Sequence, residues 1–286
     1  MGEEGYVEVT GGRVWYSIQG EGDGVPLVAV HGGPGTTHNA SVGLAELGER
    51  RVVFYDQLGC GRSDRVDDPG LWTIERFVEE IGQLRASLDL ERVHLHGTSW
   101  GAMVAAAYMG TRPSGVASLT LASPLISVAR WTDDARRLRS RLPEAVQRVL
   151  DHHEENAYTG CPEYIAAYLV FYKRHVCRLE VWPDPLERSF KEASREMYET
   201  MWGPSEFHPT GTLVGADVSE DLTRVSCPAL FLCGEHDEAT PSATRHFASL
   251  VPDSRIEVFE GCSHMPLLEA PERYLGVLRR FLADVA

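Results

Sequence analysis

Residues 97–101 read Gly-Thr-Ser-Trp-Gly, the residue types and spacing of a turn that presents a nucleophilic serine. An apolar run at 93–95 precedes Ser99 and an alanine-rich run follows it, which predicts a strand, a sharp turn and a helix. Glycine at 97 and 101 fits, because side chains there would press against the backbone. A helix that begins at Ser99 also directs its N-terminal dipole toward negative charge that develops beside the hydroxyl.

An aspartate and a histidine later in the chain complete a set of groups for nucleophilic catalysis. Asp237 and His264 each follow an apolar run typical of a strand, so both are expected on loops at the carboxyl edge of a sheet. The order serine, aspartate, histidine accompanies a serine on such a turn. We predict that His264 takes the proton of Ser99 and that Asp237 holds the imidazole ring. Glu235 and Glu238 remain alternative partners for that ring.

A glycine-rich segment, His31-Gly32-Gly33-Pro34-Gly35, follows the apolar run 26–30, which is typical of a strand buried on both faces. Such a loop could hold a phosphate or an oxyanion, or could be a plain tight turn. The chain contains neither G-x-x-x-x-G-K-[ST] nor G-x-G-x-x-G, so we favour the oxyanion. We expect the backbone N–H groups of Gly33 and Trp100 to form the oxyanion hole.

Alternating strand and helix patterns predict an α/β fold with a mostly parallel sheet and helices on both faces. The expected strands are 6–9, 14–18, 26–30, 51–55, 93–95, 118–122, 228–233 and 255–259, and the expected core helices are 73–88, a helix from Ser99, and 241–250. The segment 125–211 has no strand-like run, and we predict a helical cap there. Its expected helices are 130–142, 144–156, 162–178 and 185–201. The core domain is then formed by residues 1–124 and 212–286.

The bulk composition narrows the class of protein. The chain has 286 residues, 43% of them hydrophobic, and a formal net charge of −15, which argues against nucleic acid as a partner. We see no signal peptide and no membrane-spanning run, and expect a cytoplasmic protein. The six cysteines lack metal-binding spacing, so we expect reduced thiols, no metal and no cofactor.

Two pairs of residues outside these motifs carry further expectations. His94 and His96 alternate on a buried strand and are expected to be hydrogen-bonded core histidines. Cys60 and Cys262 lie on loops beside the predicted site. We therefore expect bulky thiol reagents to reach these two cysteines and to inhibit the protein.

Five motifs together resemble the proline iminopeptidase family of α/β-hydrolases, which includes the archaeal tricorn-interacting aminopeptidase. They are His31-Gly-Gly-Pro-Gly35, Asp56-Gln-Leu-Gly-Cys-Gly-Arg-Ser-Asp64, Gly97-Thr-Ser-Trp-Gly101, Arg174-His-Val-Cys-Arg178 and Met201-Trp-Gly-Pro-Ser-Glu-Phe207. The resemblance covers nearly the whole chain. It implies an α/β-hydrolase fold with an inserted cap, and the removal of an N-terminal residue, often proline, from a short peptide or amide.

The resemblance also implies that Glu206 and Glu238 bind the free α-amino group of the substrate. From the residue pattern alone, Glu206 would be a solvated cap residue. Two other functions stay open on the same motifs. One is an esterase or amino-acid amidase that uses the same triad. The other is a small-molecule receptor that keeps the fold without turnover.

Overall fold

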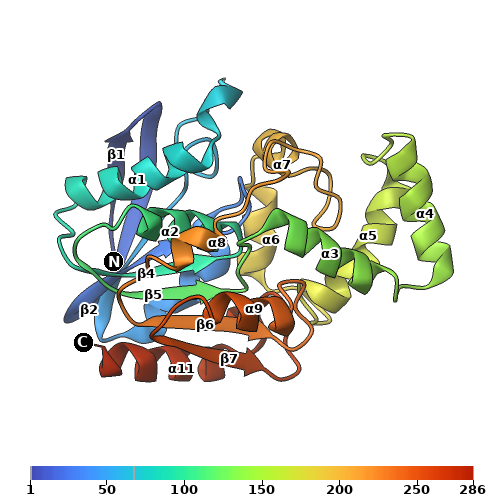
Figure 1. Ribbon diagram of the computed structural model, residues 1–286. Helices are drawn as coiled ribbons and strands as arrows, with labels where there is room; N and C mark the ends of the chain where they lie inside the picture. The colour runs from blue at the N-terminus through green and yellow to red at the C-terminus, as the bar shows by residue number, and fades with distance from the viewer. Residues whose placement is uncertain (1, 67, 286) are drawn as a thin grey trace.

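The computed structural model describes residues 2–66 and 68–285, and its strands form one sheet (Figure 1). The strand order is β1-β2-β4-β5-β6-β7, with β3 paired to β2. All neighbours from β4 to β7 pair in parallel, which confirms the predicted mostly parallel sheet. The strands are β1 (Glu3–Val9), β2 (Gly12–Val30), β3 (Arg50–Tyr55), β4 (Val93–Thr98), β5 (Val116–Ala122), β6 (Ala229–Gly234) and β7 (Ser254–Phe259).

The strands predicted at 14–18 and 26–30 are the two halves of the single long strand β2. Its first half pairs antiparallel with β1 and with β3. Val52 of β3 is paired with both Gln19 and Leu27, so β3 lies between the two halves of β2. In the second half the numbers of paired residues rise together, as in Leu27 with Val52 and Ala29 with Phe54, which is a parallel register. The sequence pattern missed this continuity because the polar stretch between the two apolar runs resembles a loop.

Alternate side chains of the strands enter two separate cores. Val28 and Val30 pack toward the face covered by α1 (Ile74–Ser87), α2 (Trp100–Gly110) and α9 (Pro241–Ala248). Leu27 and Ala29 pack toward the opposite face, under α11 (Pro271–Asp284) and the 3-10 helix η1 (His38–Leu47). Because both faces are covered (Figure 1), the run from Leu27 to Val30 is apolar at every position. The short elements η2 (Pro69–Leu71), α8 (Ser219–Leu222) and α10 (Pro266–Glu269) complete the connections.

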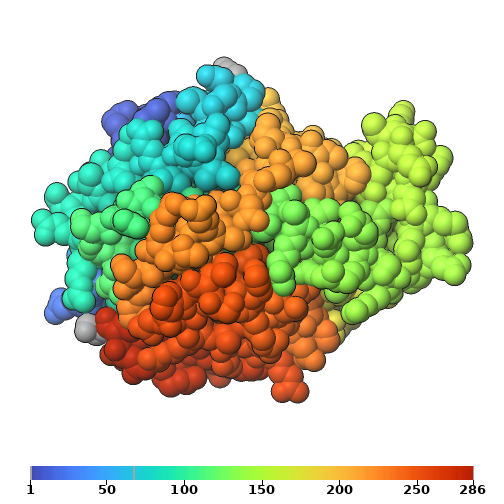
Figure 2. Space-filling view, viewed as in Figure 1, coloured from blue at the N-terminus to red at the C-terminus, as the bar shows by residue number. Residues whose placement is uncertain are grey.

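Five helices of the described chain follow β5 and precede α8. They are α3 (Val128–Arg139), α4 (Glu144–Glu155), α5 (Pro162–His175), α6 (Asp184–Lys191) and α7 (Arg195–Met201). Helix α4 and part of α5 form a protrusion at one end of the molecule (Figure 2). The helix predicted at 185–201 is in fact two helices, because Ser194 starts α7 by accepting a hydrogen bond from the Met197 N–H. The helix predicted at 162–178 ends at His175.

His94 and His96 are buried and hydrogen-bonded, as predicted. The His94 ring bonds Ser118 Oγ at 2.8 Å, and His96 Nε2 shares a 2.7 Å hydrogen bond with the Tyr274 hydroxyl of α11. Burial lowers the pKa of both histidines to about 4, which keeps them neutral. Both rings therefore tie β4 to neighbouring elements.

Tyr274→Phe should lower the free energy of unfolding by about 1–3 kcal/mol, because it leaves His96 Nε2 buried without its partner. Urea denaturation measures this change. Tyr6→Phe is the matched control, because Tyr6 is 51% exposed and should shift stability by less than about 0.5 kcal/mol. Equal effects of the two variants would contradict a stabilising role for the His96 bond.

Candidate active site

Ser99 stands at the turn between β4 and α2 with φ 55° and ψ −119°. A positive φ is strained for serine and persists only where the surroundings enforce it. A Cβ on Gly97 would lie 2.4 Å from the Gly101 carbonyl oxygen, and one on Gly101 would lie 2.2 Å from the Val30 oxygen. Only glycine fits at both positions, and the turn places Ser99 at the carboxyl edge of the sheet.

The Asp237 and His264 loops meet at this same edge, because β6 and β7 are parallel neighbours. His264 Nδ1 lies 2.7 Å from Asp237 Oδ1. Asp237 also accepts the N–H groups of Ala239 at 2.8 Å and Gly234 at 3.3 Å, which hold its carboxylate in place. Burial by itself lowers the pKa of His264, but the charge and hydrogen bond of Asp237, together with the charges of Glu206 and Glu269, outweigh it, and the pKa is raised.

The two alternative partners for the histidine are arranged differently. Glu238 Oε1 lies 3.9 Å from His264 Nδ1, beyond hydrogen-bond distance. Glu235 is half exposed and accepts the Gly261 N–H at 3.0 Å. Of the three acids, Asp237 alone has the geometry to orient the ring.

Ser99 and His264 line one cavity of about 410 Å³ between the sheet edge and the helices 128–201. The cavity is built from both parts of the chain. Gly32 and Gly33 line it from the core side. Aromatic residues and two acids, Glu199 and Glu206, line it from the helical side. The aromatic residues include Tyr168, Tyr172, Trp182, Phe190 and Tyr198.

The glycine-rich loop after β2 lies against the serine. A Cβ on Gly32 would be 3.3 Å from Ser99 Cβ. Gly33 has φ +119°, and a side chain there would meet the Gly35 and Thr36 nitrogens at 2.7 and 2.8 Å. Trp100 is the first residue of α2, so its N–H has no acceptor within the helix. These features suit Gly33 and Trp100 as donors to an oxyanion.

Gln57 joins this loop to the serine turn. Its side chain accepts a 2.9 Å hydrogen bond from Trp100 Nε1 and donates one of 3.0 Å to the His31 oxygen. Its backbone N–H donates to His31 Nε2 at 2.9 Å. Burial lowers the pKa of His31 to about 4, so the ring is neutral and can accept that bond.

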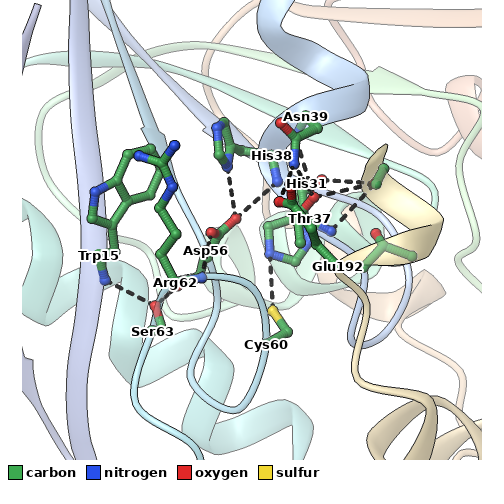
Figure 3. Close-up of polar contacts among 12 residues, drawn as sticks. Trp15, His31, Thr37, His38, Asn39, Asp56, Cys60, Arg62, Ser63 and Glu192 are labelled. Carbon is green, nitrogen blue, oxygen red and sulfur yellow. Dashed lines mark hydrogen bonds and ion pairs between the residues drawn. The ribbon is translucent and has the colours of Figure 1, made fainter. Parts of the chain in front are cut away.

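Asp56, the preceding residue, organises the adjoining segment (Figure 3). Its carboxylate accepts bonds from the His38 N–H at 3.0 Å, His38 Nδ1 at 2.8 Å and the Arg62 N–H at 2.9 Å. Burial by itself raises the pKa of Asp56, but the His38 contact outweighs it, and the pKa is lowered. In the sequence, residues 56–64 are recognised only as one of the motifs that resemble the family. Their role in holding the loops depends on contacts that the spacing does not show.

Glu206 and Glu238 both lie near His264. The Glu206 carboxylate accepts a 2.8 Å bond from the Tyr198 hydroxyl and lines the cavity. Glu238 is 1% exposed, and in the described residues neither of its carboxylate oxygens has a hydrogen-bond partner. Burial raises the pKa of both acids, and the charges of Glu206 and Asp237 raise that of Glu238 further. An organic cation bound here would donate hydrogen bonds to the Glu238 carboxylate and offset the repulsion between these acids.

The expectation of accessible thiols is wrong. Cys60 has no exposed surface, and its thiol donates a 3.0 Å hydrogen bond to the backbone carbonyl oxygen of Gln57. Cys262 is 4% exposed. Burial raises the pKa of both thiols, which disfavours the reactive thiolate. Loop position in the sequence did not show that both loops fold inward.

The fold and the serine turn define an α/β-hydrolase, and the family model described as "alpha/beta hydrolase fold" matches residues 25–271. The crystal structure of VinJ superposes with a TM-score of 0.96 at 38% identity, over 99% of each chain. The crystal structure of a proline iminopeptidase from Mycobacterium smegmatis superposes with a TM-score of 0.91 at 36% identity, over 99% of this chain and 98% of that one.

Two curated relatives extend this likeness through the whole chain. The proline iminopeptidase of Heyndrickxia coagulans is 45% identical over 290 residues, which is 100% of both chains. That of Saccharolobus solfataricus is 35% identical over 288 residues, 99% of this chain and 93% of its own. The chain belongs to the proline iminopeptidase family, and it is a hydrolase. Separately, no helix in the described ranges has the length and apolar character needed to cross a membrane.

Ser99→Ala should lower kcat/KM for an aminoacyl arylamide by about 10⁴-fold or more, because the attacking oxygen is removed. Steady-state kinetics measures the loss, and circular dichroism checks the fold. Ser249→Ala is the control, because Ser249 is exposed and bonds only the His246 oxygen locally. Retained activity in Ser99→Ala would exclude Ser99 as nucleophile.

The pH dependence follows from His264, which must be neutral to accept a proton. Its pKa is raised above 6.5, so kcat/KM should rise with pH and reach half its plateau above pH 6.5. p-Nitrophenyl acetate is a suitable substrate, because it carries no amine to titrate. A midpoint at or below 6.5 would show that the neighbouring carboxylates do not outweigh the effect of burial on the His264 ring.

Proposed function

We propose that this hydrolase is a serine aminopeptidase that releases N-terminal proline, or a small apolar residue, from short peptides or amides. The observation that carries the proposal is the pair of carboxylates beside the triad histidine, of which Glu238 is buried and Glu206 is partly exposed to the cavity. The names of the curated relatives support proline as the released residue.

The proposed ligand of Glu206 and Glu238 is the free ammonium group of the substrate. Carboxylates without partners are costly when buried, and a cation with two N–H donors offsets that cost. The secondary ammonium of an N-terminal proline has two such donors. Binding it should draw both acids into their ionised form, although burial raises the pKa of each in the free protein.

The chemistry we propose is acyl transfer through Ser99. Ser99 attacks the carbonyl of the first residue while His264 takes its proton, and Asp237 holds the charged ring. The N–H groups of Gly33 and Trp100 donate to the developing oxyanion. His264 then protonates the leaving amine, and water hydrolyses the acyl-enzyme.

We propose that residues 125–211 act as a cap on the core formed by 1–124 and 212–286. The cap supplies Glu206 and the aromatic wall of the cavity. Because Glu206 and Ser99 line the same cavity, we expect their separation to admit one residue between the amine and the scissile carbonyl, which would make the enzyme an exopeptidase. A cytoplasmic location belongs to the same proposal and is supported by six free cysteines.

Glu238→Gln should lower kcat/KM for a free-amine prolyl arylamide by about 10²-fold or more, because one charge opposite the ammonium is lost. The same variant should leave N-acetylprolyl arylamide turnover within about twofold. Prolyl, alanyl and leucyl arylamides, each with and without acetylation, identify the preferred first residue. Glu235→Gln is the control, since that neighbouring acid is half exposed.

The substrate panel also separates the competing functions. Equal turnover of acetylated substrates or simple esters would establish an esterase and refute amine recognition. A preference for amino-acid amides over peptides would indicate an amidase. Absence of turnover from every substrate would favour the receptor.

A further inference from the structure

The motif Arg174-His-Val-Cys-Arg178 has no part in the mechanism above, yet it lies against both catalytic loops. It begins in the last turn of α5 and continues into the segment that follows. Helix α5 leads back from the outer end of the cap toward the core (Figure 1). The motif is therefore where the cap helix meets the loops that carry Asp237 and His264.

His175 makes one hydrogen bond to each loop. Its carbonyl oxygen accepts the His264 N–H at 3.2 Å. Its Nδ1 lies 2.8 Å from the carbonyl oxygen of His236, the residue before Asp237. A carbonyl can only accept, so Nδ1 carries the proton and donates it. The two loops also contact each other, since the His236 N–H donates to the Cys262 oxygen at 2.9 Å.

Glu269 of α10 makes a second link a few residues away. Its carboxylate accepts the Arg178 N–H at 2.7 Å, just beyond the end of α5. It also accepts the N–H of Ser263 at 2.6 Å and the Ser263 hydroxyl at 2.8 Å. Ser263 precedes His264, so the backbone of the histidine is held to the cap segment on two sides.

The His175 ring continues toward the amine-binding side of the cavity. It packs on Phe171 with ring centres 4.8 Å apart, and Phe171 packs on Phe207 at the same separation. Phe207 follows Glu206 in the chain. The residue that touches both catalytic loops is thus also packed, through two rings, against the segment that carries Glu206.

We propose that His175 is a positioning residue that holds the Asp237 and His264 loops in register with each other and with the cap. It acts through the backbone of His236 and His264 and touches no reacting atom. A displacement of about 1 Å between reacting groups can lower the rate by about 10²-fold. The hydrogen bonds that hold these two loops therefore control how well the Asp237 and His264 side chains are aligned. The inference depends on the proposed triad and on no particular substrate.

Two substitutions divide the functions of the His175 side chain. His175→Phe keeps a ring against Phe171 and loses the donor to His236. His175→Asn loses the ring and keeps an N–H near the position of Nδ1. Lys173→Ala is the matched control, because Lys173 is an exposed residue of the same helix. Active-site titration with a fluorophosphonate normalises each rate to the amount of folded enzyme.

His175→Phe should lower kcat by about threefold to tenfold per active site, the equivalent of one lost hydrogen bond, with KM within about twofold. The acid limb of kcat/KM for p-nitrophenyl acetate should move to lower pH, because the Asp237–His264 pair is less well aligned. His175→Asn should recover at least half of the lost kcat and of the pH shift. Simple loss of folded protein would change neither kcat per site nor the pH midpoint.

The proposal is refuted if His175→Phe retains wild-type kcat and pH midpoint, or if the Asn and Phe variants lose activity equally. If His175→Phe does not fold, His175→Leu takes its place, because leucine also lacks the donor to the His236 oxygen. It should shift the same midpoint downward, and an unmoved midpoint refutes the proposal. Failure of the aminopeptidase function is recognised separately, because the wild-type protein would then show no preference for free-amine substrates.

Discussion

The rest of the site depends on the strained conformation of Ser99. Its positive φ survives because the serine turn is packed against the end of β2, where Gly101 approaches the Val30 oxygen too closely for any side chain. The strain is sustained by the parallel pairing of β2 and β4, whose register aligns Val30 with Gly97. The sheet that forms the core therefore also holds Ser99 in a backbone conformation that serine disfavours.

The buried histidines around Ser99 differ in pKa according to whether a carboxylate lies beside them. His31, His94 and His96 are buried without a carboxylate in hydrogen-bond contact, and their pKa values are lowered. His264 is equally enclosed, but Asp237 lies against its Nδ1 and its pKa is raised. The same side chain is thus a structural acceptor at one position and a proton carrier at another, according to the charge beside it.

The helical segment contributes to the site as much as the sheet does. Glu206, Tyr198 and the aromatic wall come from it, and the end of α5 contacts the loops of Asp237 and His264. Trp131 of α3 adds another connection, because its Nε1 donates to the backbone carbonyl oxygen of Glu206 and its ring packs edge-on against His264. Glu206 and the His264 ring are therefore joined through one set of packed side chains.

Local sequence predicted those parts of the protein that local physics controls. The apolar periodicity of the strands and helices, and the glycines flanking Ser99, follow from backbone geometry within a few residues. The sequence also placed Ser99, Asp237 and His264 at strand ends, and parallel strands bring such ends to one edge. It missed the continuity of β2 and the break between α6 and α7, where short polar stretches leave the backbone path ambiguous.

Tertiary structure alone decided which groups are buried and which meet. Asp237 rather than Glu238 contacts the His264 ring, although the two acids are adjacent in the chain. Cys60 and Cys262 point inward from loops that look exposed in the sequence. The position of His175 between two loops depends on residues more than 60 positions apart, since its Nδ1 meets His236 across a separation of 61. Desolvation and long-range contacts set these features, and neither is encoded in the spacing of neighbouring residues.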